Sequence, residues 1–446
     1  MWYTFYVARC YSRLKVLRLL LFLGLLAMGA FVSSARAASP TVDVLQVKGT
    51  INPVLVDYIQ RGISQAQKTK AVALIIQLDT PGGLDTSMRD IIKDIVDSPV
   101  PVVVYVSPAG SRAASAGVFI TVASHVAAMS PNTAIGAAHP VSIGTQGEAQ
   151  MSTTMEEKVV NDAAAYMRSI AQAHGRNMEW AEKAVRESVS ATEQEALKLN
   201  IIDIVATDLD DLVTKLNGRK VTLLGGAVLT LNTEGATITP LPMNTVEKIL
   251  YTIADPNIAY LLLSLGSLGI LAEIYNPGLI FPGVIGGISL LLGFYALGVL
   301  PVNYAGVLLI GLAFLFFLAE VFTHSYGLLT VGGLISLVLG SLIMFKGGPL
   351  FRVNPWLIVT LAGLIGGFLA FVVTQVIRVH RRQATTGREA LVGKIATVKS
   401  VLKPQGMVLF KGELWTAVSD IGKIEPGEEV TIVGVEGLKL HVAKKG

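Results

Sequence analysis

Cysteine is almost absent from this chain. The 446 residues contain one, Cys10, and it lies in an N-terminal segment that we expect to be removed. A mature chain without a thiol excludes disulfides, thiolate catalysis and cysteine-based metal sites. The six histidines are scattered and form no His-x-x-x-His pair, so we predict no metal site and no cofactor.

Charge is also scarce. Charged residues make up 15% of the chain, the net charge is +4, and no basic cluster with interleaved aromatic residues occurs. These features argue against nucleic acid as a partner. Hydrophobic residues reach 52%, which is too high for a wholly soluble protein and indicates contact with membrane lipid.

Residues 1–37 have the pattern of a secretory signal peptide. A basic region precedes the apolar run "LLLFLGLLAMGAFV", and Ala35-Arg36-Ala37 supplies an A-x-A site, with cleavage expected before Ala38. The alternative is an uncleaved membrane anchor. Cleavage would place residue 38 outside the cytoplasm.

Residues 38–240 alternate strand-like apolar runs with helical patterns, which predicts a mainly parallel α/β sheet. Asn52 followed by Pro53 is typical of a helix start. Thr192 and Glu195 form a capping box that opens another helix. Short strands are expected over 219–240.

Residues 241–256 predict an amphipathic linker helix on the membrane surface. Residues 257–378 hold five apolar segments near the length that crosses a bilayer. The first contains Glu273 and has a re-entrant segment as its alternative, so four or five spans are expected. Five spans would put the C-terminus in the cytoplasm, as the cluster "RVHRR" (378–382) favours and Lys346 and Arg352 weakly oppose.

Residues 387–446 have short alternating runs separated by glycine and proline. This pattern predicts a small antiparallel five-stranded β-barrel of the OB-fold type. Phe410 and Trp415 are its only aromatic residues, too few for a stacking platform that binds nucleic acid. A protein-contact or structural role is expected for this domain.

Ser115, within "AASAGVFI", is the candidate nucleophile. It begins a helix at the C-terminal ends of the strands, where open α/β sheets place their sites, and small residues surround it. Gly82-Gly83 follows a buried strand, so their backbone N–H groups, with that of Ala116, are candidate oxyanion donors. The plainer alternative is a helix-packing serine beside a tight turn.

Two residues compete as the base that activates Ser115. His139 in "IGAAHPV" has the more natural pKa. Lys158 in "EEKVVNDAAAY" begins a long helix, but a lysine base must be uncharged, which requires burial that lowers its pKa from about 10.4. The pattern alone favours a solvated lysine paired with Glu156 or Glu157.

These motifs together resemble the long-form NfeD family of membrane-bound serine proteases. The matching features are "LDTPGG", "AASAGVFI", "AIGAAHPV", the signal peptide, the spans and the β tail, and they cover essentially the whole chain. The resemblance implies an α/β ClpP/crotonase-like domain related to SppA, then a polytopic α-helical membrane domain, then an OB-fold. It also implies Ser115 as nucleophile, Lys158 as its partner and Gly83 as oxyanion donor.

The resemblance further implies a stomatin- or prohibitin-like membrane protein as substrate or partner, cleaved in hydrophobic segments. We expect a multi-pass cell-membrane protein and a homo-oligomer, with the protease domain outside and the OB-fold in the cytoplasm. The alternative is a membrane scaffold working with SPFH-type proteins, with a Ser115/His139 site or no proteolytic role. Acyl-CoA chemistry shares the fold but is disfavoured, because exported domains do not meet CoA thioesters.

Overall fold

The computed structural model describes residues 39–140, 153–278, 280–323, 325, 327–346, 348–380, 388–420 and 422–445. The predicted signal peptide lies outside these residues. The described residues fall into two compact units. One is drawn from residues up to 314 and from 336–358, and the other from 315–335 and from 359 onward.

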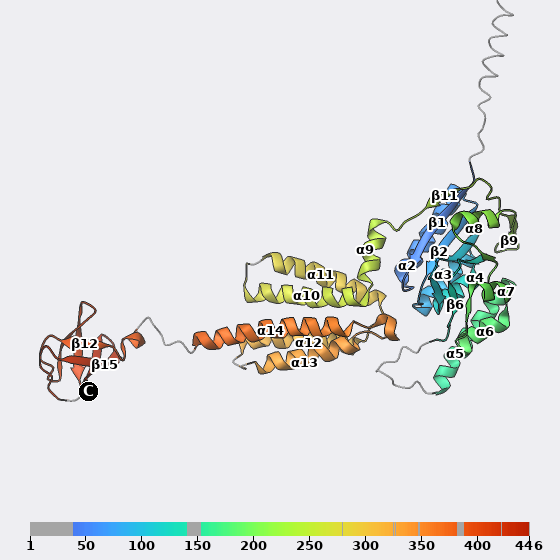
Figure 1. Cartoon of the computed structure of the whole chain (residues 1–446). Coiled ribbons are helices and arrows are strands. Elements are labelled where there is room, and N and C mark those ends of the chain that lie inside the picture. Colours follow the sequence, from blue (N-terminus) through green and yellow to red (C-terminus); the bar gives the residue numbers. More distant parts are fainter. Residues whose placement is uncertain are drawn as a thin grey trace, which may run out of the picture. The chain divides into compact units, whose positions relative to one another are not determined.

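A six-stranded parallel sheet forms the centre of the first unit (Figure 1). Its order is β11-β1-β2-β3-β5-β8, and every neighbouring pair is parallel. The strands are β1 (Thr41–Lys48), β2 (Ala73–Asp79), β3 (Val102–Val106), β5 (Val126–Met129), β8 (Ile204–Val205) and β11 (Thr237–Pro240). The predicted parallel α/β sheet is confirmed.

Helices cover both faces of this sheet. The larger core joins one face to α2 (Pro53–Thr69), α3 (Asp85–Val96), α4 (Ala116–Ala123), α5 (Thr153–Ala173), α6 (Met178–Arg186) and α7 (Glu193–Lys198). The smaller core joins the other face to α8 (Leu209–Leu216). The central strands are therefore buried on both sides, which explains their nearly continuous apolar sequence.

The predicted helix starts are confirmed in atomic detail. The side chain of Asn52 accepts a hydrogen bond from the Leu55 N–H at 3.1 Å, with Pro53 in the first turn of α2. Thr192 and Glu195 form the reciprocal capping box of α7. These side chains satisfy N–H groups that no helical carbonyl can reach.

Two smaller sheets complete the α/β domain. β4 (Arg112–Ala114), β6 (Ala134–Gly136) and β7 (Ser190–Thr192) form a three-stranded sheet, and β9 (Lys220–Thr222) pairs with β10 (Val228–Thr230). A bridge between Thr80 and Ala113 connects the end of β2 to β4. The three-stranded sheet is therefore attached to the carboxyl edge of the main sheet.

α9 (Thr245–Ile253) precedes five apolar helices. These are α10 (Pro256–Tyr275), α11 (Ile280–Val299), α12 (Tyr304–Phe322), α13 (Leu328–Ile343) and α14 (Pro355–His380), with a short 3-10 turn η1 (Gly348–Phe351) between the last two. Among the described residues, α10, α11 and Pro355–Val372 of α14 are long and apolar enough to cross a membrane. The apolar stretches Tyr304–Glu320 and Leu328–Ile343 are shorter. The number of spans stays a prediction.

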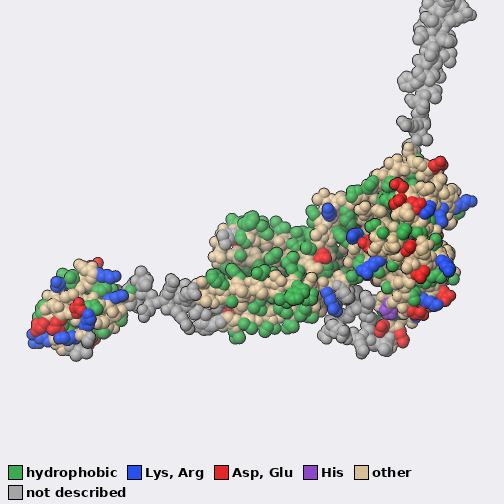
Figure 2. Space-filling view, viewed as in Figure 1, with side chains coloured by type: hydrophobic (Ala, Val, Ile, Leu, Met, Phe, Trp, Pro, Cys, Tyr) green, Lys and Arg blue, Asp and Glu red, His purple; other side chains and the backbone are tan. Residues whose placement is uncertain are grey.

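Glycines bring α10 and α11 close together. A β-carbon at Gly286 would lie 2.7 Å from the Gly266 carbonyl oxygen, so only glycine permits this approach. Small residues play the same part at many helix contacts in membranes. Away from this contact, side chains such as Phe281 and Leu291 are exposed, and Figure 2 shows hydrophobic side chains over much of the visible face of α10 and α11.

A closed five-stranded barrel forms the end of the second unit. Its order is β12-β13-β14-β16-β15, from β12 (Ile395–Val398), β13 (Gln405–Phe410), β14 (Glu413–Ser419), β15 (Glu429–Glu436) and β16 (Lys439–Lys444), with a 3-10 turn η2 (Arg388–Leu391) before it. The barrel is confirmed, but the expectation that it is wholly antiparallel is wrong, because β14 and β16 pair in parallel. Directions cannot alternate all the way around an odd number of strands.

Candidate active site

Ser115 lies at a sharp turn between β4 and α4. Its backbone has φ 52° and ψ −116°, a conformation that residues other than glycine rarely adopt. Strained strand-to-helix turns of this kind present nucleophilic serines in hydrolases. The small neighbour Gly117 is required, since a β-carbon there would lie 2.6 Å from Thr80 Cγ2. The backbone N–H of Ser115 donates to Ala137 O at 3.2 Å, which fixes the turn against the strand before His139.

The glycine pair lies directly beside this serine. Gly82 has φ +119°, and a β-carbon there would be 2.7 Å from Ser115 Cβ and 3.0 Å from Ser115 Oγ. The Gly82 N–H donates to Thr80 Oγ1 at 3.0 Å, so it is already engaged. The two segments that the sequence analysis assigned to one site therefore lie side by side, and a side chain at position 82 would collide with Ser115.

Two N–H groups near Ser115 remain available. In the part of the chain that the structure describes, no acceptor engages the N–H of Gly83 or of Ala116. Ala116 is the first residue of α4, where the helix leaves its N–H groups unpaired and favours negative charge. Both groups are of the kind that stabilises an oxyanion.

His139 is half-buried, and its orientation is set by the backbone. Its Nδ1 lies 2.8 Å from Val185 O, so in the neutral ring Nδ1 carries the proton and Nε2 is the acceptor. This tautomer is the one a histidine base needs. The structure gives no direct hydrogen bond between His139 and Ser115.

Lys158 is exposed in the first turns of α5, and no ion pair or hydrogen bond to it occurs among the described residues. The expected pairing with Glu156 or Glu157 is therefore not seen. Residues 141–152, which connect His139 to α5, lie outside the described residues. The burial that a neutral lysine needs is not supplied by the residues described around it.

The stripe of α5 that carries Lys158 is docked on the helices of the site. Asp162, one turn later, pairs with Arg89 of α3 at 2.6 Å. Tyr166, one turn further, lies under the same guanidinium and stacks on Phe119 of α4 with ring centroids 6.1 Å apart. Residues four apart share one helix face, so Lys158 lies on the face that contacts the helices following Gly83 and Ser115.

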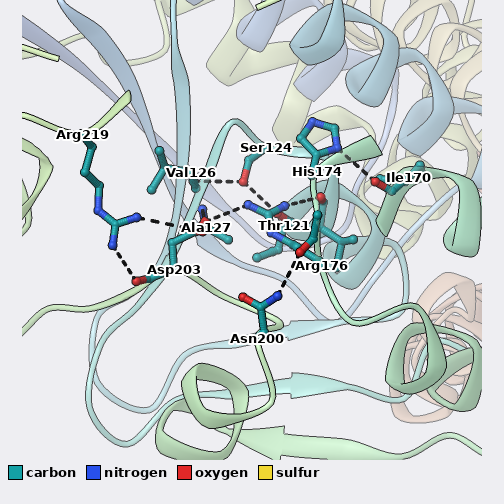
Figure 3. Close-up of polar contacts among 12 residues, drawn as sticks. Thr121, Ser124, Val126, Ala127, Ile170, His174, Arg176, Asn200, Asp203 and Arg219 are labelled. Atoms are coloured by element: carbon teal, nitrogen blue, oxygen red, sulfur yellow. Dashed lines mark hydrogen bonds and ion pairs between the residues drawn. The ribbon is translucent and has the colours of Figure 1, made fainter. Parts of the chain in front are cut away.

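A buried arginine that sequence reasoning missed holds the other end of α4 (Figure 3). The Arg176 guanidinium donates to Thr121 O at 3.1 Å and to Val122 O, and it pairs with Asp203 Oδ2 at 3.0 Å. Asp203 also accepts from the Ala127 N–H at 2.8 Å. No local pattern marks Arg176, because its partners lie 27 or more residues away in sequence.

Metal binding has no support from side-chain clusters in the described ranges, which contain no group of three His, Cys, Asp or Glu residues placed to hold an ion. The groups described above for the candidate site are the Ser115 hydroxyl, two backbone donors and two candidate bases.

Three domain families match the chain in order. Residues 41–239 match the NfeD1b N-terminal domain, residues 257–375 the NfeD integral membrane domain, and residues 388–444 the NfeD-like C-terminal, partner-binding domain. Together these matches cover the α/β domain, the apolar helices and the barrel.

Two relatives match the chain over nearly the whole length of both sequences. The chain is 39% identical to the membrane-bound protease PH1510 of Pyrococcus horikoshii, covering 93% of this chain and 96% of that protein. It is 28% identical to the membrane protein NfeD1b of Bacillus subtilis, covering 92% and 94%. A solved structure of 1510-N, described as a membrane-bound stomatin-specific protease in complex with a substrate peptide, is 37% identical, with coverage of 48% and 98% and a TM-score of 0.45.

The predicted family is confirmed by the extent of these matches. An α/β domain, apolar helices and a closed barrel follow one another in the order that the resemblance implied. The chain is a membrane protein of the NfeD family.

Proposed function

We propose that this chain is a membrane-bound serine peptidase with Ser115 as its nucleophile. The observation that carries the proposal is the strained turn at Ser115, with the unengaged N–H groups of Gly83 and Ala116 beside it. The relative of 39% identity is named a protease, which supports the same class of reaction. A helix-packing serine would not require positive φ at a non-glycine residue.

In the proposed reaction Ser115 Oγ adds to the peptide carbonyl and gives up its proton to the base. The carbonyl oxygen takes the negative charge and accepts hydrogen bonds from Gly83 and Ala116. The base then donates the proton to the leaving amine, the C–N bond breaks, and an acyl-enzyme remains. Water, deprotonated by the same base, hydrolyses the ester and returns Ser115.

Lys158 is the base in this proposal, with His139 as the alternative. Support comes from the family resemblance and from the docking of its helix stripe on α3 and α4. The exposed side chain of Met155, 50% accessible, lies three residues before Lys158 and is its neighbour on the surface of α5, and that of Val159, 39% accessible, follows Met155 by four residues. An apolar substrate segment covering them would remove water from the amine and favour its neutral form.

The same surface supports hydrophobic segments as substrates. A stomatin-like membrane protein is the proposed partner, because the solved relative is described as stomatin-specific. The barrel is the proposed recruiting domain, since its family is described as partner-binding. A homo-oligomer and contact with membrane lipid remain part of the proposal.

The test uses the full chain purified in detergent. A fluorophosphonate should label one serine, Ser115, and the chain should cleave an apolar peptide. Ser115→Ala should abolish labelling and lower cleavage by about 10⁴-fold or more. Ser64→Ala, an exposed serine on α2, is the matched control and should change neither. Labelling elsewhere, or full activity of Ser115→Ala, would exclude this site.

The base is decided in the same assay. Lys158→Ala should abolish cleavage, and His139→Asn should lower the rate of cleavage only slightly. The reverse result would identify His139 as the base. A scaffold role would instead be supported if the Ser115→Ala chain rescues every deletion phenotype while a chain truncated at Gln383 does not.

A further inference from the structure

The helix that leads to the membrane is clamped to the α/β domain. Arg61 of α2 forms two hydrogen bonds with Glu247 of α9, at 2.6 and 2.9 Å, and a third with Pro242 O at 2.9 Å. Tyr58 donates to Leu241 O at 2.7 Å. α9 and the chain before it are therefore fixed on α2.

α9 also reaches the loop that follows β1. The Tyr251 hydroxyl donates to Lys48 O at 2.7 Å. Gly49 has φ +102°, and a β-carbon there would lie 2.4 Å from Tyr251 Oη, so only glycine leaves room for this phenol. Burial raises the pKa of Tyr251, so the hydroxyl stays a donor at neutral pH.

This loop is bonded in turn to the glycine pair beside Ser115. The Ile51 N–H donates to Gly82 O at 2.9 Å, and the Leu84 N–H donates to Ile51 O at 3.0 Å. The contact is so close that a β-carbon at Gly83 would lie 2.1 Å from Ile51 O. The backbone of Ile51 therefore fixes the position of the Gly83 N–H.

A short path of contacts thus joins the first apolar helix to the candidate oxyanion donor. α9 ends at Ile253 and α10 begins at Pro256, and the Asp255 side chain caps α10 by accepting from the Asn257 N–H at 2.8 Å. Only two residues, 254 and 255, connect the helices, so α10 cannot move far without moving α9. Displacement of α10 would move Tyr251, then the 48–51 loop, then Gly83.

We propose that Tyr251 is a positioning residue that holds the Gly83 N–H in place through the 48–51 loop, and so couples the membrane region to the peptidase site. The catalytic part of this inference rests on the proposed function. An oxyanion donor acts mainly on the transition state, so loss of this support should lower kcat more than it changes KM.

The test compares Tyr251→Phe with Tyr105→Phe in the full chain in detergent. Tyr105 also donates its hydroxyl to a backbone carbonyl, Ala206 O at 2.8 Å, but on the α8 side of the sheet. Two quantities are measured for each variant: kcat and KM on an apolar peptide, and amide hydrogen exchange at Ile51 and Leu84.

Tyr251→Phe should lower kcat about tenfold at nearly constant KM, below the loss seen when a whole oxyanion donor is removed. It should also speed exchange at Ile51 and Leu84, and Tyr105→Phe should do neither. Unchanged exchange at both amides, or an equal loss of kcat in Tyr105→Phe, overturns the inference. A wild-type chain without activity refutes the proposed function instead, and the exchange comparison still decides whether Tyr251 supports the loop.

Discussion

Gly82 and Ser115 lie so close together that the candidate site has no room for a side chain at position 82. Gly82→Ala would put a methyl group 2.7 Å from Ser115 Cβ on a backbone with φ +119°. We expect at least a hundredfold loss of fluorophosphonate labelling at Ser115, because a nucleophile misplaced by about 1 Å loses that much rate.

Gly218→Ala separates this effect from backbone strain. Gly218 has φ +79° and open space around it, so both variants carry the cost of a side chain on a left-handed backbone, about 1–2 kcal/mol. Only the change at position 82 touches Ser115. Equal loss of labelling in the two variants would show that strain alone, and not contact with the serine, explains the defect.

His125 predicts a pH dependence of stability. Burial, together with the nearby His174 and Arg176 charges, lowers its pKa to about 4, and its Nδ1 accepts from the Val102 N–H at 3.1 Å. The unfolded chain binds this proton near pH 6.5 and the folded chain near pH 4. Stability should therefore be full above 6.5 and fall as pH drops toward 4, by on the order of 3 kcal/mol.

His125→Asn keeps an acceptor for Val102 but does not titrate. Thermal unfolding of the α/β domain, followed from pH 7 to pH 4, should show a smaller acid loss in this variant than in the wild type. Some loss should remain, because burial lowers the pKa of His174 as well. Identical pH profiles would contradict the assignment to His125.

For single residues, the sequence predicted positions in the fold where a local pattern marks the end of a strand or the start of a helix. Ser115, Gly82, Gly83 and Ala116 lie at strand and helix ends, which apolar periodicity locates. The environment of Lys158 could not be predicted, because the exposure of one helix turn depends on what packs against it.

Among the elements, α4 is the one that the site depends on most. Ser115 precedes its first residue, and the Arg176 guanidinium binds its last carbonyl groups. Arg176→Met should destabilise the α/β domain by about 3 kcal/mol, because the carbonyls and Asp203 lose a buried partner. A lower unfolding temperature and slower labelling of Ser115 are the measurements.

Arg219→Met is the matched control. Arg219 donates to Asp203 O at 3.1 Å, but its side chain is 40% exposed, whereas that of Arg176 is 4% exposed. Exposed pairs contribute at most about 1 kcal/mol. If the two variants have the same free energy of unfolding, the hydrogen bonds of Arg176 to the end of α4 do not stabilise the domain more than the exposed Arg219 pair does.

Sequence patterns predicted the elements better than their pairing. The helix starts at Asn52 and Thr192 follow from two or three neighbouring residues. The pairing of β11 with β1 joins residues almost 200 apart, and the parallel β14–β16 pair follows only from closure of the barrel. Neither pairing can be recognised from the sequence of the strands themselves.

For the whole molecule, the scarcity of cysteine offers a direct test of topology. Cys10 is the only cysteine, so a chain whose signal is cleaved carries none. Ser64→Cys on α2 and Glu413→Cys on the barrel, both exposed, then become single labelling sites. A membrane-impermeant maleimide should label position 64 in intact cells, and position 413 only after the membrane is opened. Labelling of both in intact cells would mean an even number of spans.

The last strand of the sheet has a consequence for biogenesis. β11 covers the outer edge of β1 from Thr237 to Pro240, sixteen residues before α10 begins at Pro256. Until these residues are synthesised and pair with it, the outer edge of β1 exposes unpaired N–H and C=O groups, and open edges of this kind recruit other chains. The sheet of the α/β domain is therefore complete only shortly before the first hydrophobic helix is synthesised, and a fragment that stops before Thr237 should aggregate.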